Sequence, residues 1–223
     1  MGKFPAGQFI LKFFLNFLTN PLEFWHMGSD MAQIFGEFDS DLPATQEYLI
    51  IGFSPSSIPL KQRWRNNGLS ADFLADYLTT FFPGGSDNSP STEKQAEVKC
   101  AVSYIANELL ENAMKFSDET SQRPISIQLH LSPERIVFVT TNTVSPQAVD
   151  KFQGYIRELT ASDPADLYIG QLEKNAEDDT SYASMLGYLT MINDYQAKIG
   201  WKFETVETDP EVITVTTMVQ LSA

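Results

Sequence analysis

A carboxylate and a carboxamide stand four residues apart within the segment Asn107–Ser117, and this pair is better suited to chemistry than any other pattern in the chain. In a helix, Glu108 and Asn112 would lie one turn apart on one side. Two such oxygen-bearing side chains can serve a hard cation such as Mg²⁺, with Asn as ligand and Glu as base or outer-shell carboxylate. An ordinary amphipathic helix with a polar stripe would show the same spacing. Helicity itself is indicated by apolar residues at three- and four-residue steps, namely Ala106, Leu109, Leu110, Ala113 and Phe116.

Two segments resemble the nucleotide-binding boxes of a known family. Glu108-x-x-x-Asn112-Ala113, followed by Lys-Phe-Ser, resembles the N-box of the GHKL ATPases, which include sensor histidine kinases, gyrase and anti-sigma-factor kinases. The segment Ser184–Asn193 is similar to the Gly-x-Gly box that caps the phosphates in the same family. The similarity extends to the order of elements from about Tyr48 to Met218. It is closest to the SpoIIAB-like anti-sigma-factor serine kinases and related cyanobacterial regulators.

The resemblance implies a role for each N-box residue. Glu108 would be the catalytic residue that activates a water or a substrate hydroxyl, and Asn112 would hold Mg²⁺ against the phosphates of ATP or ADP. Lys115 would approach the sugar or the phosphates. A solvated surface lysine is the alternative interpretation of Lys115.

The other two boxes of the family are degenerate here. The strand that should end in Asp-x-Gly-x-Gly ends in Val139–Ser145, with Asn142 as a neutral acceptor for the adenine amino group and no glycine. In the lid segment Gly187 is kept, but Met185 stands where a first glycine would cradle the phosphates. Together these departures predict that tight ATP binding is lost and that catalysis is impaired.

Three functions follow from these residues. The first is a regulatory protein that binds a partner, such as an anti-anti-sigma or sigma-like protein or a response regulator, with nucleotide control weakened or lost. The second is an active Mg-ATP-dependent serine kinase with Glu108 as base. The third is a sensor that holds a flavin or another ring compound in the former nucleotide cleft, between Met and aromatic walls.

Composition limits the class of protein and the kinds of partner that are expected. The chain has 223 residues, 43% of them hydrophobic, which is enough for a real core in one domain. A formal net charge of −14 argues against nucleic acid as a partner. The single cysteine, Cys100, excludes an intrachain disulfide, and a cytoplasmic location is the simplest expectation.

The sequence divides into an apolar N-terminal arm, residues 1–30, and one GHKL-like domain, residues 31–223. The apolar run Phe9–Leu18 is too short to span a bilayer as a helix, so no integral membrane segment is expected. The arm could pack on the domain, lie at a membrane surface, or dock on a partner or a second copy to form a homodimer. His26–Ser29 is similar to a cloning seam, so part of the arm could be foreign to the natural protein.

Hydrophobic periodicity predicts the elements of the domain. A buried strand is expected at Tyr48–Phe53, and the helical pattern from Lys61 to Phe82 is interrupted at Gly68, so that two helices are possible, with Ser70 as a new cap. Further expectations are a long helix capped by Ser91 or Thr92, a hairpin of 125–131 and 135–141, a helix at 146–159, a mobile acidic segment at 173–180, a helix at 182–198 ended by Gly200, and strands at 201–206 and 212–219. This order predicts an α+β two-layer sandwich, a mixed or antiparallel sheet with helices on one face.

Overall fold

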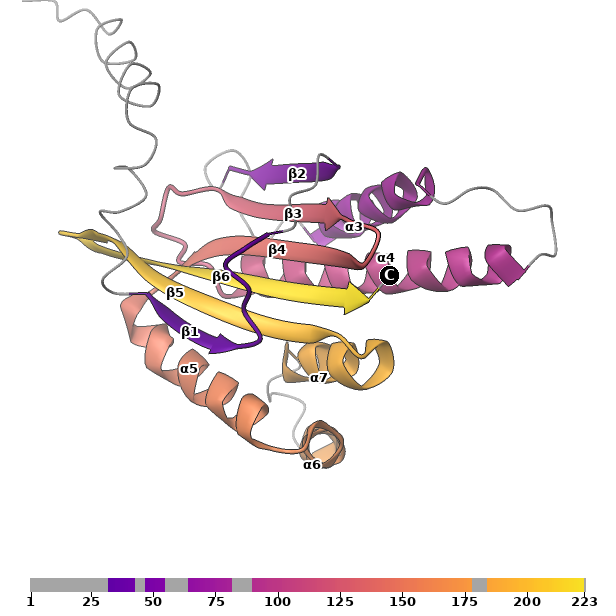
Figure 1. Ribbon diagram of the computed structural model, residues 1–223. Helices are drawn as coiled ribbons and strands as arrows, with labels where there is room; N and C mark the ends of the chain where they lie inside the picture. Colours follow the sequence, from indigo (N-terminus) through magenta and orange to yellow (C-terminus); the bar gives the residue numbers. More distant parts are fainter. Residues whose placement is uncertain (1–31, 43–46, 55–63, 82–89, 178–183, 223) are drawn as a thin grey trace, which may run out of the picture.

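The fold is α+β, with six strands and five helices in the part of the chain that the structure describes (Figure 1). The computed structural model describes residues 32–42, 47–54, 64–81, 90–177 and 184–222. The N-terminal arm and residues 82–89 lie outside these residues. The elements are β1 (Gln33–Gly36), β2 (Tyr48–Phe53), α3 (Trp64–Thr79), α4 (Pro90–Lys115), β3 (Ile125–Leu131), β4 (Arg135–Val144), α5 (Pro146–Ala161), α6 (Pro164–Glu177), α7 (Ser184–Tyr195), β5 (Lys198–Thr208) and β6 (Glu211–Ser222).

The strands form one sheet in the order β1-β5-β6-β4-β3-β2, and every neighbouring pair is antiparallel. The predicted hairpins β3–β4 and β5–β6 are confirmed, and both run longer than their alternating patterns indicated. The short edge strand β1 was not predicted. An α+β fold with an antiparallel sheet is therefore correct, and the arrangement is compatible with a two-layer sandwich.

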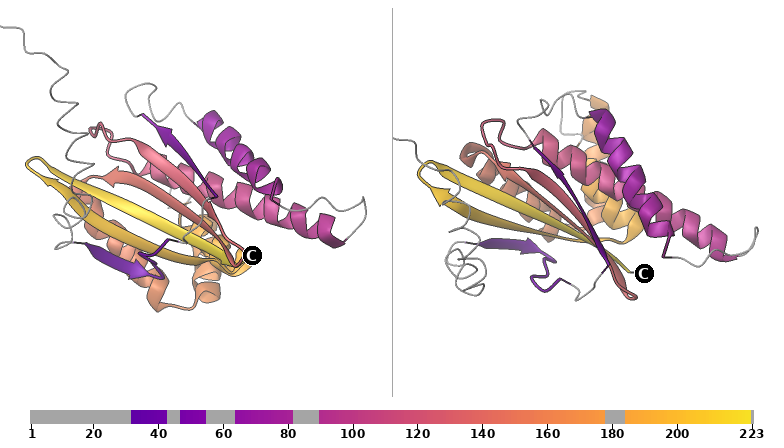
Figure 2. Two further views of the ribbon diagram at one scale, coloured as in Figure 1. Left: turned by 45° about the horizontal axis from the view of Figure 1, so that its top comes forward. Right: turned by 90° about the horizontal axis from the view of Figure 1, so that it is seen from above.

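The helices cover one face of the sheet (Figure 2). Helix α4 lies on β3 and β4, α5 on β1 and β6, and α7 on β5, while α3 packs beside α4 and α6 beside α7. Strand residues alternate between this helix-covered face and the opposite, open face. Fully buried side chains of the helix-covered face include Ile127, Leu129, Phe138, Trp201 and Val219. No helix among the described residues is long and apolar enough to cross a bilayer.

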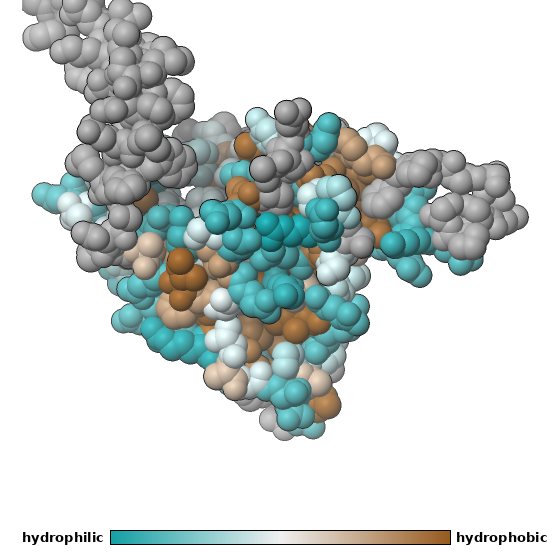
Figure 3. All heavy atoms as spheres, viewed as in Figure 1, coloured by the Kyte–Doolittle hydropathy of each residue, from teal (hydrophilic) through white to brown (hydrophobic). Residues whose placement is uncertain are grey.

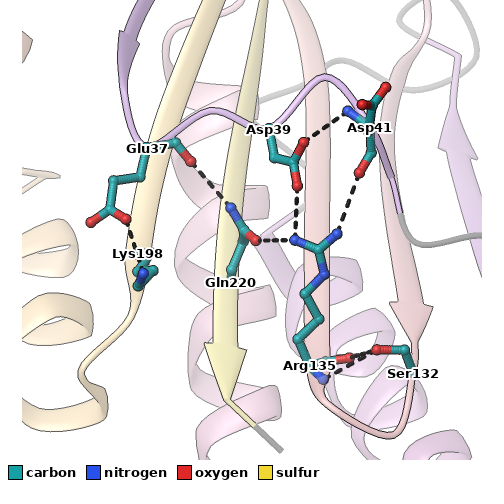
Figure 4. Close-up of polar contacts among 7 residues, drawn as sticks. All are labelled: Glu37, Asp39, Asp41, Ser132, Arg135, Lys198 and Gln220. Atoms are coloured by element: carbon teal, nitrogen blue, oxygen red, sulfur yellow. Dashed lines mark hydrogen bonds and ion pairs between the residues drawn. The ribbon is translucent and has the colours of Figure 1, made fainter.

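The segment 37–41, which we call the strap, crosses the open face between the strands at its two edges (Figure 4). Arg135 holds the strap by donating to Asp39 Oδ2 at 2.9 Å, to Asp41 O at 3.3 Å and to Gln220 Oε1 at 2.8 Å. The side-chain hydrogen bond from Arg135 and the backbone N–H of Asp41 lower the pKa of Asp39. Phe38 packs on a small cluster of its own, made of Val137, Val139 and Met218. Hydrophilic groups gather over the middle of this face in the space-filling view (Figure 3).

Several predicted boundaries were wrong for local reasons. Helix α3 continues through Gly68 as one helix, and Ser70 is no cap, because its hydroxyl donates to Asn66 O one turn back at 2.8 Å. The long helix α4 begins at Pro90, before the expected caps. Helix α7 ends at Tyr195, so Gly200 lies inside β5 and does not end a helix.

Two further expectations also need correction. The segment expected to be mobile and acidic belongs to α6 as far as Glu177, and residues 178–180 lie outside the described chain. Asp163 caps α6 by accepting from Ala165 N at 2.9 Å, with Pro164 at the first helical position. Strand β2 is mostly exposed rather than buried, because it is an edge strand.

The absence of a side chain at Gly200 of β5 should be essential where the strap crosses this strand. A Cβ at this position would overlap the backbone of Glu37 and Phe38, whereas a Cβ at Gly154, in α5, would meet nothing within 4 Å. We expect Gly200→Ala to lower the free energy of unfolding by about 1–3 kcal/mol. Gly154→Ala should raise it by up to about 1 kcal/mol, through helix propensity alone. Urea unfolding of both variants measures this, and equal effects would contradict the described crossing.

Candidate functional site

Helix α4 places Glu108 and Asn112 on the side that faces α7. Its apolar side chains pack beneath the sheet and include Val102, Ile105, Ala106, Leu109, Leu110 and Ala113, all of them buried. The two polar residues lie beside this stripe, so that Asn112 is buried at 7% exposure and Glu108 is half-buried. The amphipathic spacing therefore builds the core and turns the polar pair toward one neighbouring helix.

Glu108 lies directly against Gly187 of α7. A Cβ added at Gly187 would overlap Oε2 of Glu108, so a larger residue would require the Glu108 carboxylate to move. Burial raises the pKa of Glu108, and the nearby carboxylate of Glu111 raises it further. Glu111 itself accepts from Asn107 Nδ2 at 2.9 Å. The described residues offer Glu108 no hydrogen bond and no ion pair, so its carboxylate is neither neutralised nor oriented by a partner.

Tyr188 fills the space beside Asn112. Its ring is buried and meets the indole of Trp201 edge to face, with centroids 5.4 Å apart. Burial raises the pKa of the Tyr188 hydroxyl, and the neighbouring side chains of Trp201, Thr217 and Asn112 partly offset this rise. Even so, Asn112 Nδ2 and Trp201 Nε1 are buried without a hydrogen bond of good geometry to the described residues. The Asn112 and Trp201 N–H groups thus both lie near the Tyr188 hydroxyl, and neither forms a well-oriented hydrogen bond with it.

A cavity remains between α4, α5, α7 and the sheet, and it is very small. Its volume is about 10 Å³, enough for about one water molecule. Asn142 lines it from β4, where its Nδ2 donates to Thr143 O at 3.1 Å. The wall is completed by Leu109, Asn112, Ala113, Phe116, Thr140, Phe152, Tyr188 and Thr217.

The predicted site residues are only partly brought together. Asn112 and Asn142 line the same cavity, and Glu108 meets Gly187 one turn away. Lys115 is exposed at the end of α4, where its ammonium lies 5.3 Å from the ring centre of Phe116, and it does not line the cavity. Met185 is the second residue of α7, and its side chain lies outside the described part.

Sequence reasoning missed the polar residues that the sheet turns toward the cavity. Thr140 and Thr217 occupy inward-facing positions in β4 and β6: Thr140 lies between Phe138 and Asn142, and Thr217 lies between Val215 and Val219. A polar residue within an otherwise apolar alternation was the available signal. The sequence indicates only aromatic walls for the cleft, whereas the hydroxyl of Tyr188 lies at the centre of the polar cluster.

The described cavity is far smaller than the pockets of roughly 300–1,000 Å³ that drug-sized ligands occupy. The carboxylate of Glu108 occupies the space beside Gly187. Within the described residues no three His, Cys, Asp or Glu side chains gather where they could hold a metal.

No model of a known protein family matches the chain, and no curated protein matches it.

The Glu108–Gly187 contact can be measured as a coupling energy. Gly187→Ala alone should force the Glu108 carboxylate away from α7, whereas in a Glu108→Ala background the added methyl group meets no other atom closer than 3.6 Å, an ordinary van der Waals distance. We therefore expect the substitution at Gly187 to be more favourable in the double variant, by roughly 0.5–3 kcal/mol. Urea unfolding of the four proteins closes the cycle, and additive effects would show that the contact does not form.

The raised pKa of Glu108 predicts a pH-dependent effect on stability. The native state binds this proton more tightly than the unfolded state, so the associated stabilisation is present below the ordinary value of 4.5 and is lost as the pH rises through the folded pKa. Glu108→Gln should therefore be more stabilising, relative to the wild type, at pH 7 than at pH 4. Glu93→Gln, at the exposed start of the same helix, is the control. A Glu108→Gln effect that is constant with pH would refute the buried placement.

Proposed function

We propose that the protein is a regulatory, signalling protein that acts by binding another protein, on a degenerate GHKL-like fold. The N-box pair Glu108 and Asn112, on a long helix packed against an antiparallel sheet, supports the resemblance. The order of helices and hairpins after the N-box supports it too. The partner would be of the anti-anti-sigma, sigma-like or response-regulator kind, met in the cytoplasm.

The closed cleft is the observation that carries this proposal. Tyr188 occupies the space beside Asn112, and the half of the lid box that remains, Gly187, contacts the N-box carboxylate. A nucleotide could enter only if α7 moved away from α4 and uncovered the buried Tyr188 ring. Such a movement removes aromatic surface from the core and costs free energy that ATP binding would have to supply. Weakened or absent nucleotide control follows.

The degenerate adenine box supports the same conclusion. Asn142 stands in place of the family's Asp, and its Nδ2 is already bonded to Thr143 O. Its remaining carbonyl oxygen is a neutral acceptor, which binds an amino group less strongly than a carboxylate does. Asn142 is also part of β4, paired with Val215 of β6, so its backbone lacks the freedom of a glycine-rich turn.

An active serine kinase is the alternative function, because the chain retains the two N-box residues, Glu108 and Asn112, that such a kinase would require. In an open arrangement, Glu108 would be the base and the Asn112 carboxamide oxygen would face the metal. The raised pKa of Glu108 suits a general base, since it lies closer to neutral pH than that of an ordinary glutamate. A flavin or another ring compound would need the same opening of the cleft.

Thermal unfolding with and without Mg-ATP tests the proposal. A ligand at a hundred times its Kd stabilises a protein by about 2.7 kcal/mol, which is several degrees in Tm for a chain of this size. We expect 1 mM Mg-ATP to leave Tm unchanged for the wild type and for Asn112→Ala alike. A rise in Tm that disappears in Asn112→Ala would instead support the kinase. Mg-ATP-dependent phosphorylation of a captured partner, lost in Glu108→Ala, would establish it.

A further inference from the structure

The buried hydroxyl of Tyr188 has more hydrogen-bond donors around it than it can accept from. Side chains from three elements lie within its reach, namely Trp201 of β5, Thr217 of β6 and Asn112 of α4. A phenolic oxygen accepts at most about two hydrogen bonds. At least one of these donors therefore needs another acceptor. The N–H groups of Asn112 and Trp201 are the two that form no well-oriented bond with the described residues.

Of these two donors, Asn112 has space beside it. Its side chain is 7% exposed and lines the cavity of about 10 Å³, whereas Trp201 is not part of the described lining. A cavity needs roughly 10–15 Å³ of this kind of volume to hold one water molecule, so any larger molecule is excluded from the closed arrangement. A buried donor without a partner beside such a space points to a small ligand that accepts a hydrogen bond.

The opposite wall of the cavity offers acceptors. Asn142 uses its Nδ2 to donate to Thr143 O at 3.1 Å, so its carbonyl oxygen is left to accept. The hydroxyl of Thr140 donates to Thr217 O at 3.4 Å, which leaves its own oxygen as an acceptor. The ligand must therefore accept on the α4 side and donate on the β4 side.

The lining also decides against an ion. None of the described lining residues is charged, so a buried anion beside Asn112 would have no counter-charge and would cost much free energy. A cation would be repelled by the amide N–H that lacks a partner. Water meets both requirements, because it accepts and donates and carries no charge. Buried water molecules typically make about three hydrogen bonds, which is the number that Asn112, Asn142 and Thr140 provide together.

We propose that this cavity binds one ordered water molecule, which accepts from Asn112 Nδ2 and donates to Asn142 and to the hydroxyl of Thr140. The water joins α4 to the middle of the sheet. The rings of Phe116, Phe152 and Tyr188 complete its wall, so it leaves only when one of these rings moves. Its exchange with bulk water therefore reports the opening of the cleft. The proposal does not rest on the proposed function, since it concerns only the closed arrangement of these residues.

Oxygen-17 magnetic relaxation dispersion of the full chain tests the proposal, because it counts the water molecules that stay bound for longer than the protein takes to tumble. We expect Asn112→Leu, which removes the donor, to lose one such molecule relative to the wild type. Thr140→Val keeps the shape of the side chain without its hydroxyl and should shorten the residence time of the same molecule. Thr141→Val is the matched control, because Thr141 lies on the opposite, open face of β4, and it should change neither the number nor the residence time.

A direct measurement identifies the site. In the wild type, the side-chain N–H protons of Asn112 should show a nuclear Overhauser cross peak to water with the sign of a long-lived contact. Absence of this peak overturns the proposal, and so does an unchanged number of bound molecules in Asn112→Leu. A peak that disappears as chloride is added would show an anion site and would refute water as the ligand. Circular dichroism shows whether each variant is folded, and if Asn112→Leu is not, Thr140→Val against Thr141→Val decides.

Discussion

Helix α4 is packed on two sides at once, and this double constraint places the rest of the molecule. One side buries an apolar stripe on β3 and β4, and the other meets α7 and α3. Side chains project from a helix in fixed directions. The packing of the apolar stripe therefore also fixes where the residues beside it point. Glu108 and Asn112 are therefore turned toward α7 by the same periodicity that makes the core. The site is a consequence of how α4 is packed.

The surroundings of Asn112 show the free-energy cost of fixing α4 in this position. Thr140, Asn142 and Thr217 face inward from the sheet where apolar residues would pack more simply. Asn112 and Trp201 each leave a buried donor without a well-placed acceptor. A buried donor without a partner costs about 1–3 kcal/mol. A cavity of about one water next to these donors is the natural place for that deficit to be relieved.

The sequence predicts strongly periodic elements well and tertiary choices poorly. The hairpins and the helix at Pro146 follow from alternation and from a favoured proline position, both of which are local signals. Strand β1 is short and is specified by its pairing with β5 rather than by its own residues. Gly68 is a helix breaker by propensity, yet the packing of α3 on α4 overrides it.

The helical pair of the site was predictable from the sequence, whereas the residues that the sheet contributes and the closure of the site were not. The spacing of Glu108 and Asn112 is legible because it lies within one helix. By contrast, the contact of Gly187 with Glu108 depends on how two helices 79 residues apart approach each other. Tyr188 could be recognised as a large aromatic next to a glycine, but only the fold shows that its hydroxyl points to Asn112 and Thr217.

If the cleft opened, α6 and α7 would move rather than the sheet. Helix α6 packs mainly on α7, and Asn193 Nδ2 of α7 donates to Pro164 O at the start of α6 at 3.2 Å, so the two helices form one unit. Aromatic contacts hold this unit in place: Tyr195 of α7 lies 5.4 Å from Tyr104 of α4, and Tyr188 of α7 packs on Trp201 of β5. The strap, by contrast, fixes the open face through Arg135 and does not touch α7. A movement of α6 and α7 together would therefore change the cleft while the sheet and both of its edges stay in place.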